Sequence, residues 1–180
     1  MEQIEIEELF KDSSRAIKLY YQYSTDAYYD VLTESVPHGW TVKLQLKMLA
    51  QRLEKSSESV LFEPFVERPK AFKVVFRGKD IAFLQIGHDV WNNRVRVWEL
   101  LVLPEYRRMR IGSKLMTLTK AEAKALGARA IVLETQSCNV PAIHFYLKHG
   151  FQLIGFDLTH YSNDDMARKE VRLEFGLSIV

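Results

Sequence analysis

The fold is decided by Leu103-Pro104-Glu105-Tyr106-Arg107-Arg108-Met109-Arg110-Ile111-Gly112-Ser113-Lys114-Leu115-Met116, where an apolar strand runs into a basic loop and the loop into a helix. We predict the strand over residues 95–103 and the helix over 112–126. The first N–H groups of a helix have no partner within it, and the helix dipole favours negative charge there. Three arginines in four residues add positive charge at the same place. The stretch therefore predicts an anion site, and we expect its ligand to carry a pyrophosphate.

Another helix is predicted by Asn139-Val140-Pro141-Ala142-Ile143-His144-Phe145-Tyr146-Leu147-Lys148-His149-Gly150-Phe151. Asn139 can cap this helix, Pro141 fits its first turn, and Gly150 can end it. A strand at residues 130–134 lies between the two blocks. It is too apolar to be half-exposed, so we expect it in the centre of a sheet.

Both blocks resemble the GNAT N-acetyltransferases. Arg107-x-x-Arg110-x-Gly112 is similar to their acetyl-CoA loop, whose pattern is Gln/Arg-x-x-Gly-x-Gly/Ala. Arg110 departs from the glycine of that pattern. An arginine fits there if it keeps φ below zero, and its side chain could then reach a phosphate itself. The second block is similar to the family's Asn-x-x-Ala-x-x-Phe-Tyr-x-x-x-Gly-Phe segment. The resemblance covers residues 82–180, and the first eighty residues match only in outline.

The pattern of elements predicts an α+β fold in a single domain over residues 1–180. We expect strands at residues 4–6, 27–32, 71–76, 81–86, 95–103, 130–134, 151–157 and 171–178. We expect helices at 41–53, 112–126 and 139–149, the first of them because Lys, Gln, Leu and Ala are good helix formers. Residues 36–39 and 91–93 are turn signals. The resemblance implies the GNAT fold, a mixed, mostly antiparallel twisted sheet flanked by helices.

Composition narrows the class of protein. The 180 residues carry a net charge of +2, which is too mild to argue for nucleic acid. One cysteine excludes an internal disulfide framework and suits a reducing compartment. The sequence has neither a visible signal peptide nor a membrane-length apolar stretch, so we expect a soluble cytoplasmic protein that binds no membrane. The five histidines have no metal-ligand spacing, so no metal is expected.

Acetyl transfer from a thioester to an amine needs a base, an oxyanion stabiliser and an acid. The resemblance implies that Tyr146 is the acid, although a helical tyrosine beside Phe145 is more often a packing residue. Glu99 lies in an apolar strand, where a carboxylate is either paired or functional, and Glu134 on the neighbouring strand is its competitor as the base. The resemblance also implies that backbone N–H groups near Val102 or Leu103 stabilise the oxyanion.

Acetyl-CoA is the co-substrate that the resemblance implies. The residues expected to bind it are Leu101, Val102, Leu103, Arg107, Arg108, Met109, Arg110, Ile111, Gly112, Ser113, Asn139, Ala142, Phe145 and Tyr146. The alternative is that the three arginines of the loop only form a solvated turn and bind no ligand. Cys138 could be the nucleophile of a ping-pong scheme, but a small apolar filler is the better interpretation because the family transfers directly.

The residue patterns leave more than one class of acceptor amine possible. Residues 133–157 are similar to streptothricin acetyltransferases, which act on a lysine-like amine. Trp91, Asp157 and Tyr161 fall where this family places its substrate loops, and they would suit a cationic amine. We therefore expect a small-molecule amine, streptothricin-like or polyamine-like. Alternatives are a protein N-terminal or lysine acetyltransferase, and a non-catalytic acyl-CoA sensor. Many family members are dimers, so a homodimer is an expectation too, although no residue pattern marks a dimer face.

Overall fold

A computed structural model describes residues 4–11 and 16–179. The chain divides into two compact units, and each is described by itself. Unit 1 comprises Met1–Gln22, Ser56–Leu133 and Gly176–Val180, and unit 2 comprises Tyr23–Lys55 and Glu134–Phe175. The prediction of a single domain stays a prediction. No helix among the described residues is long and apolar enough to cross a membrane.

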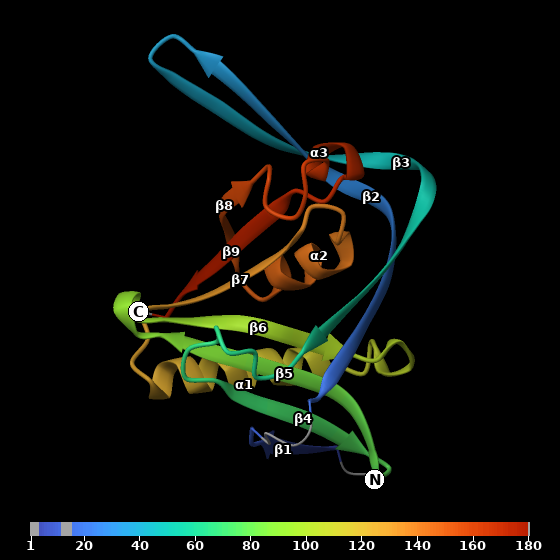
Figure 1. The fold of residues 1–180 in the computed structure, drawn as a ribbon, viewed down its shortest axis with the longest axis vertical. Coiled ribbons are helices and arrows are strands. Elements are labelled where there is room, and N and C mark those ends of the chain that lie inside the picture. Colours follow the sequence, from blue (N-terminus) through green and yellow to red (C-terminus); the bar gives the residue numbers. More distant parts are fainter. Residues whose placement is uncertain (1–3, 12–15, 180) are drawn as a thin grey trace. The chain divides into compact units, whose positions relative to one another are not determined.

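Unit 1 is a sheet with a helix packed on it (Figure 1). Its strands lie in the order β1 (Glu5–Leu9), β4 (Lys70–Phe76), β5 (Lys79–Asp89), β6 (Arg94–Val102) and the first half of β7 (Ala130–Gln136). Neighbours are antiparallel except β6 and β7, which are parallel and pair only as far as Arg96 and Val132. The 3₁₀ helices η1 (Val90–Asn92) and η2 (Pro104–Tyr106) follow β5 and β6.

The helix α1 (Ile111–Ala125) packs on β5 and β6 of this sheet. Its buried residues recur at the spacing of one helical face, and they are Ile111, Leu115, Met116, Thr119 and Ala123. The sheet contributes fully buried aliphatic residues, among them Ile81, Leu84 and Ile86. This core fixes the end of β6 against the start of α1, so the loop between them leaves from a rigid base.

Unit 2 holds the second half of β7, then α2 (Val140–Lys148), β8 (Gln152–Asp157), α3 (Asp165–Arg168) and the start of β9 (Arg172–Ser178). The strand order there is β7-β9-β8. It also holds most of a long hairpin made of β2 (Lys18–Val36) and β3 (Gly39–Val60), whose first and last residues belong to unit 1. The hairpin turns at His38, which has a positive φ of 68°.

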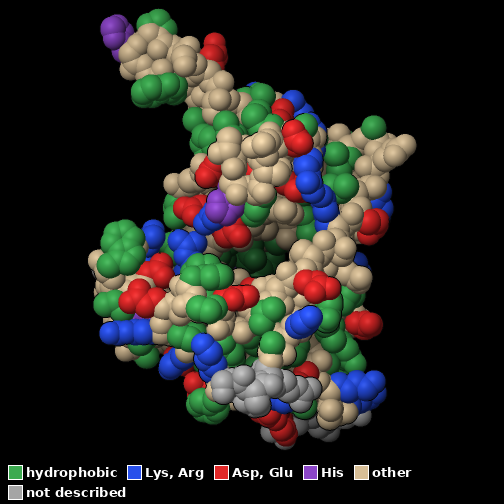
Figure 2. Space-filling view, in the orientation of Figure 1, with side chains coloured by type: hydrophobic (Ala, Val, Ile, Leu, Met, Phe, Trp, Pro, Cys, Tyr) green, Lys and Arg blue, Asp and Glu red, His purple; other side chains and the backbone are tan. Residues whose placement is uncertain are grey.

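The prediction of a helix at residues 41–53 is wrong, because this segment is part of β3. Val42, Leu44, Leu46 and Met48 alternate with polar residues, and this period of two belongs to a strand. That alternation outweighs helix propensity, which is only a weak preference. Trp40 continues this alternation two residues before Val42, and it is 80% exposed. Figure 2 shows hydrophobic side chains at the surface of the hairpin.

The other elements predicted from the sequence agree with the structure. The predicted strand at residues 27–32 lies inside the much longer β2, and the predicted turn at 36–39 joins it to β3. The hairpin predicted over 71–86 is β4 and β5, and residue 78 in its turn is a glycine with a φ of 70°. The helices predicted at 112–126 and 139–149 are α1 and α2 within one residue at each end.

Candidate active site

The basic loop enters α1 through left-handed backbone. Arg108 has a φ of 66° and Arg110 a φ of 61°. The condition under which an arginine fits this position without strain, a negative φ at Arg110, is therefore not met. Arg110 is the residue before the first helical turn, and its carbonyl accepts the N–H of Lys114 at 3.1 Å. This geometry explains why the family pattern has glycine there, since a residue with a Cβ pays roughly 1–2 kcal/mol for a left-handed φ.

Arg107 ties this loop to two other segments of unit 1. Its Nε donates to the carbonyl of Val102 at 3.1 Å, and its Nη2 donates to the carbonyl of Gln22 at 2.6 Å. The guanidinium has five N–H donors, so further donors remain for a ligand. The side chains of Arg107, Arg108 and Arg110 are all exposed, while Ile111 is buried and anchors the loop. The arrangement is a fixed, cationic turn in front of a helix N-terminus.

The end of β6 carries the other residues predicted near the thioester. Leu101 is buried, whereas Val102 and Leu103 are half-buried. The N–H of Leu103 donates to the carbonyl of Ile81 at 2.9 Å. It is therefore unavailable to an oxyanion, and Val102 is left as the candidate.

Glu99 accepts hydrogen bonds on both carboxylate oxygens. Tyr21 Oη donates to Oε2 at 2.6 Å, and Ser59 Oγ donates to Oε1. Sequence reasoning did not find either partner. Tyr21 lies on β2 and Ser59 on β3, and both are outside the two sequence blocks that resemble the family. No pattern of spacing links these positions to Glu99, which is 78 residues from Tyr21.

In unit 2, Asn139 caps α2 as predicted. Its Oδ1 accepts the N–H of Ala142 at 3.4 Å. Further along the helix, Tyr146 lies among aromatic rings, with centroid distances of 5.7 Å to Phe145, 6.1 Å to Phe151 and 6.2 Å to Phe175. The rings fix the direction of the Tyr146 side chain. This position is compatible both with packing and with a positioned acid.

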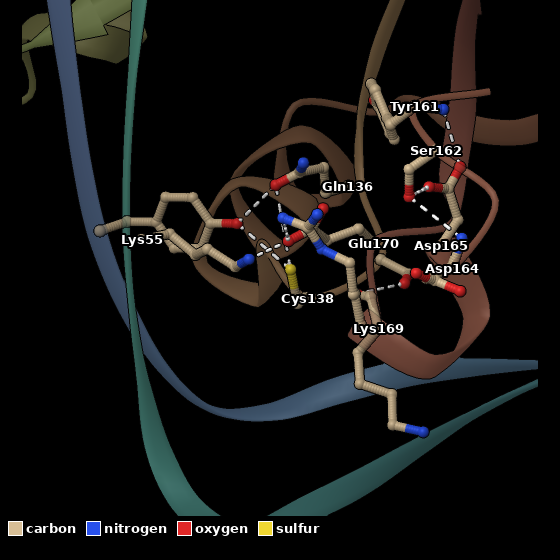
Figure 3. Close-up of polar contacts among 12 residues, drawn as sticks. Lys55, Gln136, Cys138, Tyr161, Ser162, Asp164, Asp165, Lys169 and Glu170 are labelled. Carbon is tan, nitrogen blue, oxygen red and sulfur yellow. Dashed lines mark hydrogen bonds and ion pairs between the residues drawn. The ribbon is translucent and has the colours of Figure 1, made fainter.

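Cys138 is fully buried before α2. Its Sγ lies 3.3 Å from Tyr23 Oη, which also donates to Gln136 Oε1 at 2.9 Å. Figure 3 shows the ion pair of Lys55 and Glu170 next to Cys138. Burial raises the pKa of the Cys138 thiol, and the hydrogen bond between Cys138 and Tyr23 and the charge of Lys55 only partly oppose this. A buried thiol that resists ionisation is a poor nucleophile, so the geometry speaks against a ping-pong scheme.

Glu134 is bound by two groups of unit 2. Tyr161 Oη donates to its Oε2 at 2.6 Å, and Arg172 Nε lies 3.4 Å from the same oxygen. Burial, followed by the charge of Glu134, raises the pKa of Tyr161. Glu134 and Tyr161, which the sequence predicts as a catalytic and a substrate residue, are thus in direct contact.

The remaining predicted substrate residues do not join this contact. Asp157 accepts the N–H and the hydroxyl of Thr159 at 2.9 and 3.1 Å, and these bonds lower the pKa of Asp157. Trp91 belongs to η1 in unit 1, and its side chain is 83% exposed. Within the described residues, no group of three or more His, Cys, Asp or Glu side chains is placed to hold a metal ion.

Comparison with known proteins agrees with this geometry. The sequence pattern of the acetyltransferase (GNAT) family matches residues 25–151. A streptothricin acetyltransferase from Streptomyces lavendulae is 33% identical over 93 residues, or 51% of this chain and 49% of that protein. Streptothricin acetyltransferase A from Bacillus subtilis (strain 168) is 34% identical over 73 residues, or 41% of this chain and 42% of that protein. This chain spans about half the length of the curated relatives it matches.

The crystal structure of nourseothricin acetyltransferase has the same fold. It superposes with a TM-score of 0.78 and 26% identity, over 98% of this chain and 99% of that chain. The predicted α+β GNAT fold is thereby confirmed. The matched residues 25–151 include the basic loop and the block that begins at Asn139. Because this match extends over more than half of the sequence, the chain belongs to the acetyltransferase (GNAT) family.

Proposed function

We propose that this chain is an acetyl-CoA-dependent N-acetyltransferase acting on a primary amine of a small molecule, streptothricin-like or polyamine-like. The observation that carries the proposal is the basic loop before α1. Left-handed Arg108 and Arg110 turn the chain into the helix N-terminus, and Arg107 holds the turn to Val102 and Gln22. Partial positive charge from the helix and full positive charge from the arginines suit a pyrophosphate.

In this proposal each predicted binding residue has one task. The segment 107–113 holds the pyrophosphate through its side chains and backbone N–H groups. Asn139, with Ala142 and Phe145 on the same helix, binds the pantetheine arm, and capping α2 leaves Asn139 a further lone pair for this. The end of β6, residues 101–103, lies along the thioester, where the N–H of Val102 stabilises the oxyanion.

Glu99 is better suited than Glu134 to act as the base. Glu134 has a guanidinium at 3.4 Å, so taking up a proton would cost it an ion pair. Glu99 accepts hydrogen bonds from the neutral hydroxyl groups of Tyr21 and Ser59, which stabilise the ionised carboxylate that a base needs. Glu134 and Tyr161 are then left to bind the cationic acceptor.

Transfer is direct. The amine nitrogen gives a proton to Glu99 and forms a bond to the acetyl carbon, the carbon–sulfur bond breaks, and the departing thiolate takes a proton from Tyr146. Burial of Cys138 and its raised pKa support a scheme without an acyl-cysteine. The relatives named streptothricin acetyltransferases support a small-molecule amine as the acceptor.

The test is thiol release from acetyl-CoA in the presence of a panel of amines, namely streptothricin, polyamines, free lysine and peptides with a free N-terminus. We expect release with a small-molecule amine and none without an acceptor. Release only with peptides would favour a protein acetyltransferase. Tight acetyl-CoA binding in calorimetry, with no release for any amine, would contradict the proposal and favour a sensor.

A further inference from the structure

Two hydroxyl groups converge on Glu99 from segments far away in the sequence. Tyr21 on β2 donates to Oε2 at 2.6 Å, and Ser59 on β3 donates to Oε1. They are 78 and 40 residues from Glu99, and all three side chains belong to unit 1. Each carboxylate oxygen therefore has a donor of its own.

Packing fixes both donors. The ring of Tyr21 lies against an apolar cluster whose buried members are Leu19, Leu61, Ala71 and Leu101. Two backbone N–H groups just after Ser59 donate hydrogen bonds that hold the chain there. The N–H of residue 61 donates to the carbonyl of Ile17 at 3.0 Å, and the N–H of Phe62 donates to Gln85 Oε1 at 2.6 Å. The two hydroxyl groups are thus presented to Glu99 by ordered backbone.

The strand that carries Glu99 is also irregular at this point. Gln85 pairs with Glu99 across β5 and β6, and a register shift follows directly between Gln85 and Ile86. Bulges of this kind re-aim a side chain and are frequent beside active sites. Gln85 is itself almost fully buried and is bound to the backbone of Phe62, so it supports β6 from the neighbouring strand.

Two hydroxyl donors give a carboxylate the properties that a general base needs. Hydrogen bonds to the charged form favour ionisation, which opposes the effect of an apolar strand. A carboxylate has about four lone-pair sites, so it can accept several hydrogen bonds and still be a proton acceptor. With one donor on each oxygen, the carboxylate cannot rotate without breaking a bond.

We infer that Tyr21 and Ser59 are positioning residues of the reaction, which hold Glu99 ionised and in one orientation while it takes the amine proton. This inference rests on the proposed function. Tyr21 and Ser59 keep their own protons throughout, and the proton from the amine ends on Glu99. Neither hydroxyl touches the reacting atoms in this account, so each acts only through Glu99.

The experiment is a double-mutant cycle on kcat. Tyr21→Phe and Ser59→Ala should each lower kcat about tenfold, the factor expected for one hydrogen bond to a charged acceptor. The KM for acetyl-CoA should change less than about twofold, because no substrate contact is lost. In a Glu99→Gln background Tyr21→Phe should have almost no further effect. Tyr20→Phe is the matched control, since Tyr20 is the exposed neighbour on the same strand.

Ser59→Thr keeps a hydroxyl and should restore most of the activity lost in Ser59→Ala, which separates loss of the donor from loss of folding. The inference is overturned if Tyr21→Phe and Ser59→Ala have the same kcat as active wild-type protein. It is also overturned if Tyr21→Phe costs as much in the Glu99→Gln background as in wild type. Wild-type protein without any thiol release would overturn the proposed function, and this inference with it.

Discussion

Replacement of Arg107 by methionine separates the structural role of this arginine from its role in binding. Methionine keeps much of the length of the side chain and removes the charge and all its donors. The substitution removes two hydrogen bonds, one from Nε to the carbonyl of Val102 at 3.1 Å and one from Nη2 to the carbonyl of Gln22 at 2.6 Å. They join the loop to the end of β6 and to the start of the β2–β3 hairpin, within unit 1.

The magnitude follows from these two bonds. A hydrogen bond from a charged donor is worth about 1.5–3 kcal/mol, and exposure of Arg107 to water reduces this to about 1 kcal/mol each. We therefore expect the free energy of unfolding to fall by about 2 kcal/mol. For a chain of this size the melting temperature should drop by about 4–8 °C. Loss of a cation at the pyrophosphate should also weaken acetyl-CoA binding about tenfold.

The assay is urea denaturation together with calorimetry of acetyl-CoA binding, and Arg108→Met is the control. Arg108 is exposed, and its side chain makes no hydrogen bond or ion pair to the described residues. Arg108→Met should therefore weaken acetyl-CoA binding while leaving stability within about 0.5 kcal/mol. An Arg107→Met protein as stable as wild type would refute the structural role. Wild-type affinity in both variants would refute the anion site.

Three further predictions concern other parts of the chain. Tyr146→Phe should lower turnover and leave acetyl-CoA affinity nearly intact, and unchanged turnover would remove Tyr146 from the mechanism. Gly87→Ala should lower the free energy of unfolding in urea by about 1–3 kcal/mol, because the new Cβ would lie 2.8 Å from Trp98 Nε1. Gly39→Ala is the control, since a Cβ at that position meets nothing within 4 Å. Burial raises the pKa of the Cys138 thiol in the folded protein. The contribution of this thiol to the free energy of unfolding is therefore complete below about pH 8.5, the pKa of a free cysteine, and it decreases at higher pH because the thiol ionises more readily in the unfolded chain. In urea denaturation between pH 8 and pH 10, the free energy of unfolding should decrease less for Cys138→Ala than for wild type. An equal decrease in both proteins would contradict this prediction.

Local signals account for what could be predicted from the sequence. The strand, basic loop and helix around Gly112 are contiguous, and so are the cap, first turn and end of α2. Their positions agree with the structure within one residue. The alternation from Val42 to Met48 is also a local signal. Its period of two indicates a strand, and the helix predicted there from propensity is wrong.

Non-local contacts account for what could not be predicted. Tyr21 and Ser59 reach Glu99 only because a long hairpin returns to the sheet of unit 1 at both of its ends. Arg172, the partner of Glu134 on β9, is also far from it in sequence. The left-handed φ of Arg110 is a different case, since the family glycine at that position already indicated a backbone that resists a side chain.

The measurement that tests the central claim most directly follows the acetyl group itself. Protein is mixed with acetyl-CoA labelled in the acetyl carbonyl and with streptothricin, and the acceptor is analysed by mass spectrometry while free thiol is counted. We predict one labelled acetyl group on an amine nitrogen for each thiol released, and no transfer when the amine is absent. Thiol release that leaves the acceptor unlabelled, or no release with streptothricin or any polyamine, would contradict the account.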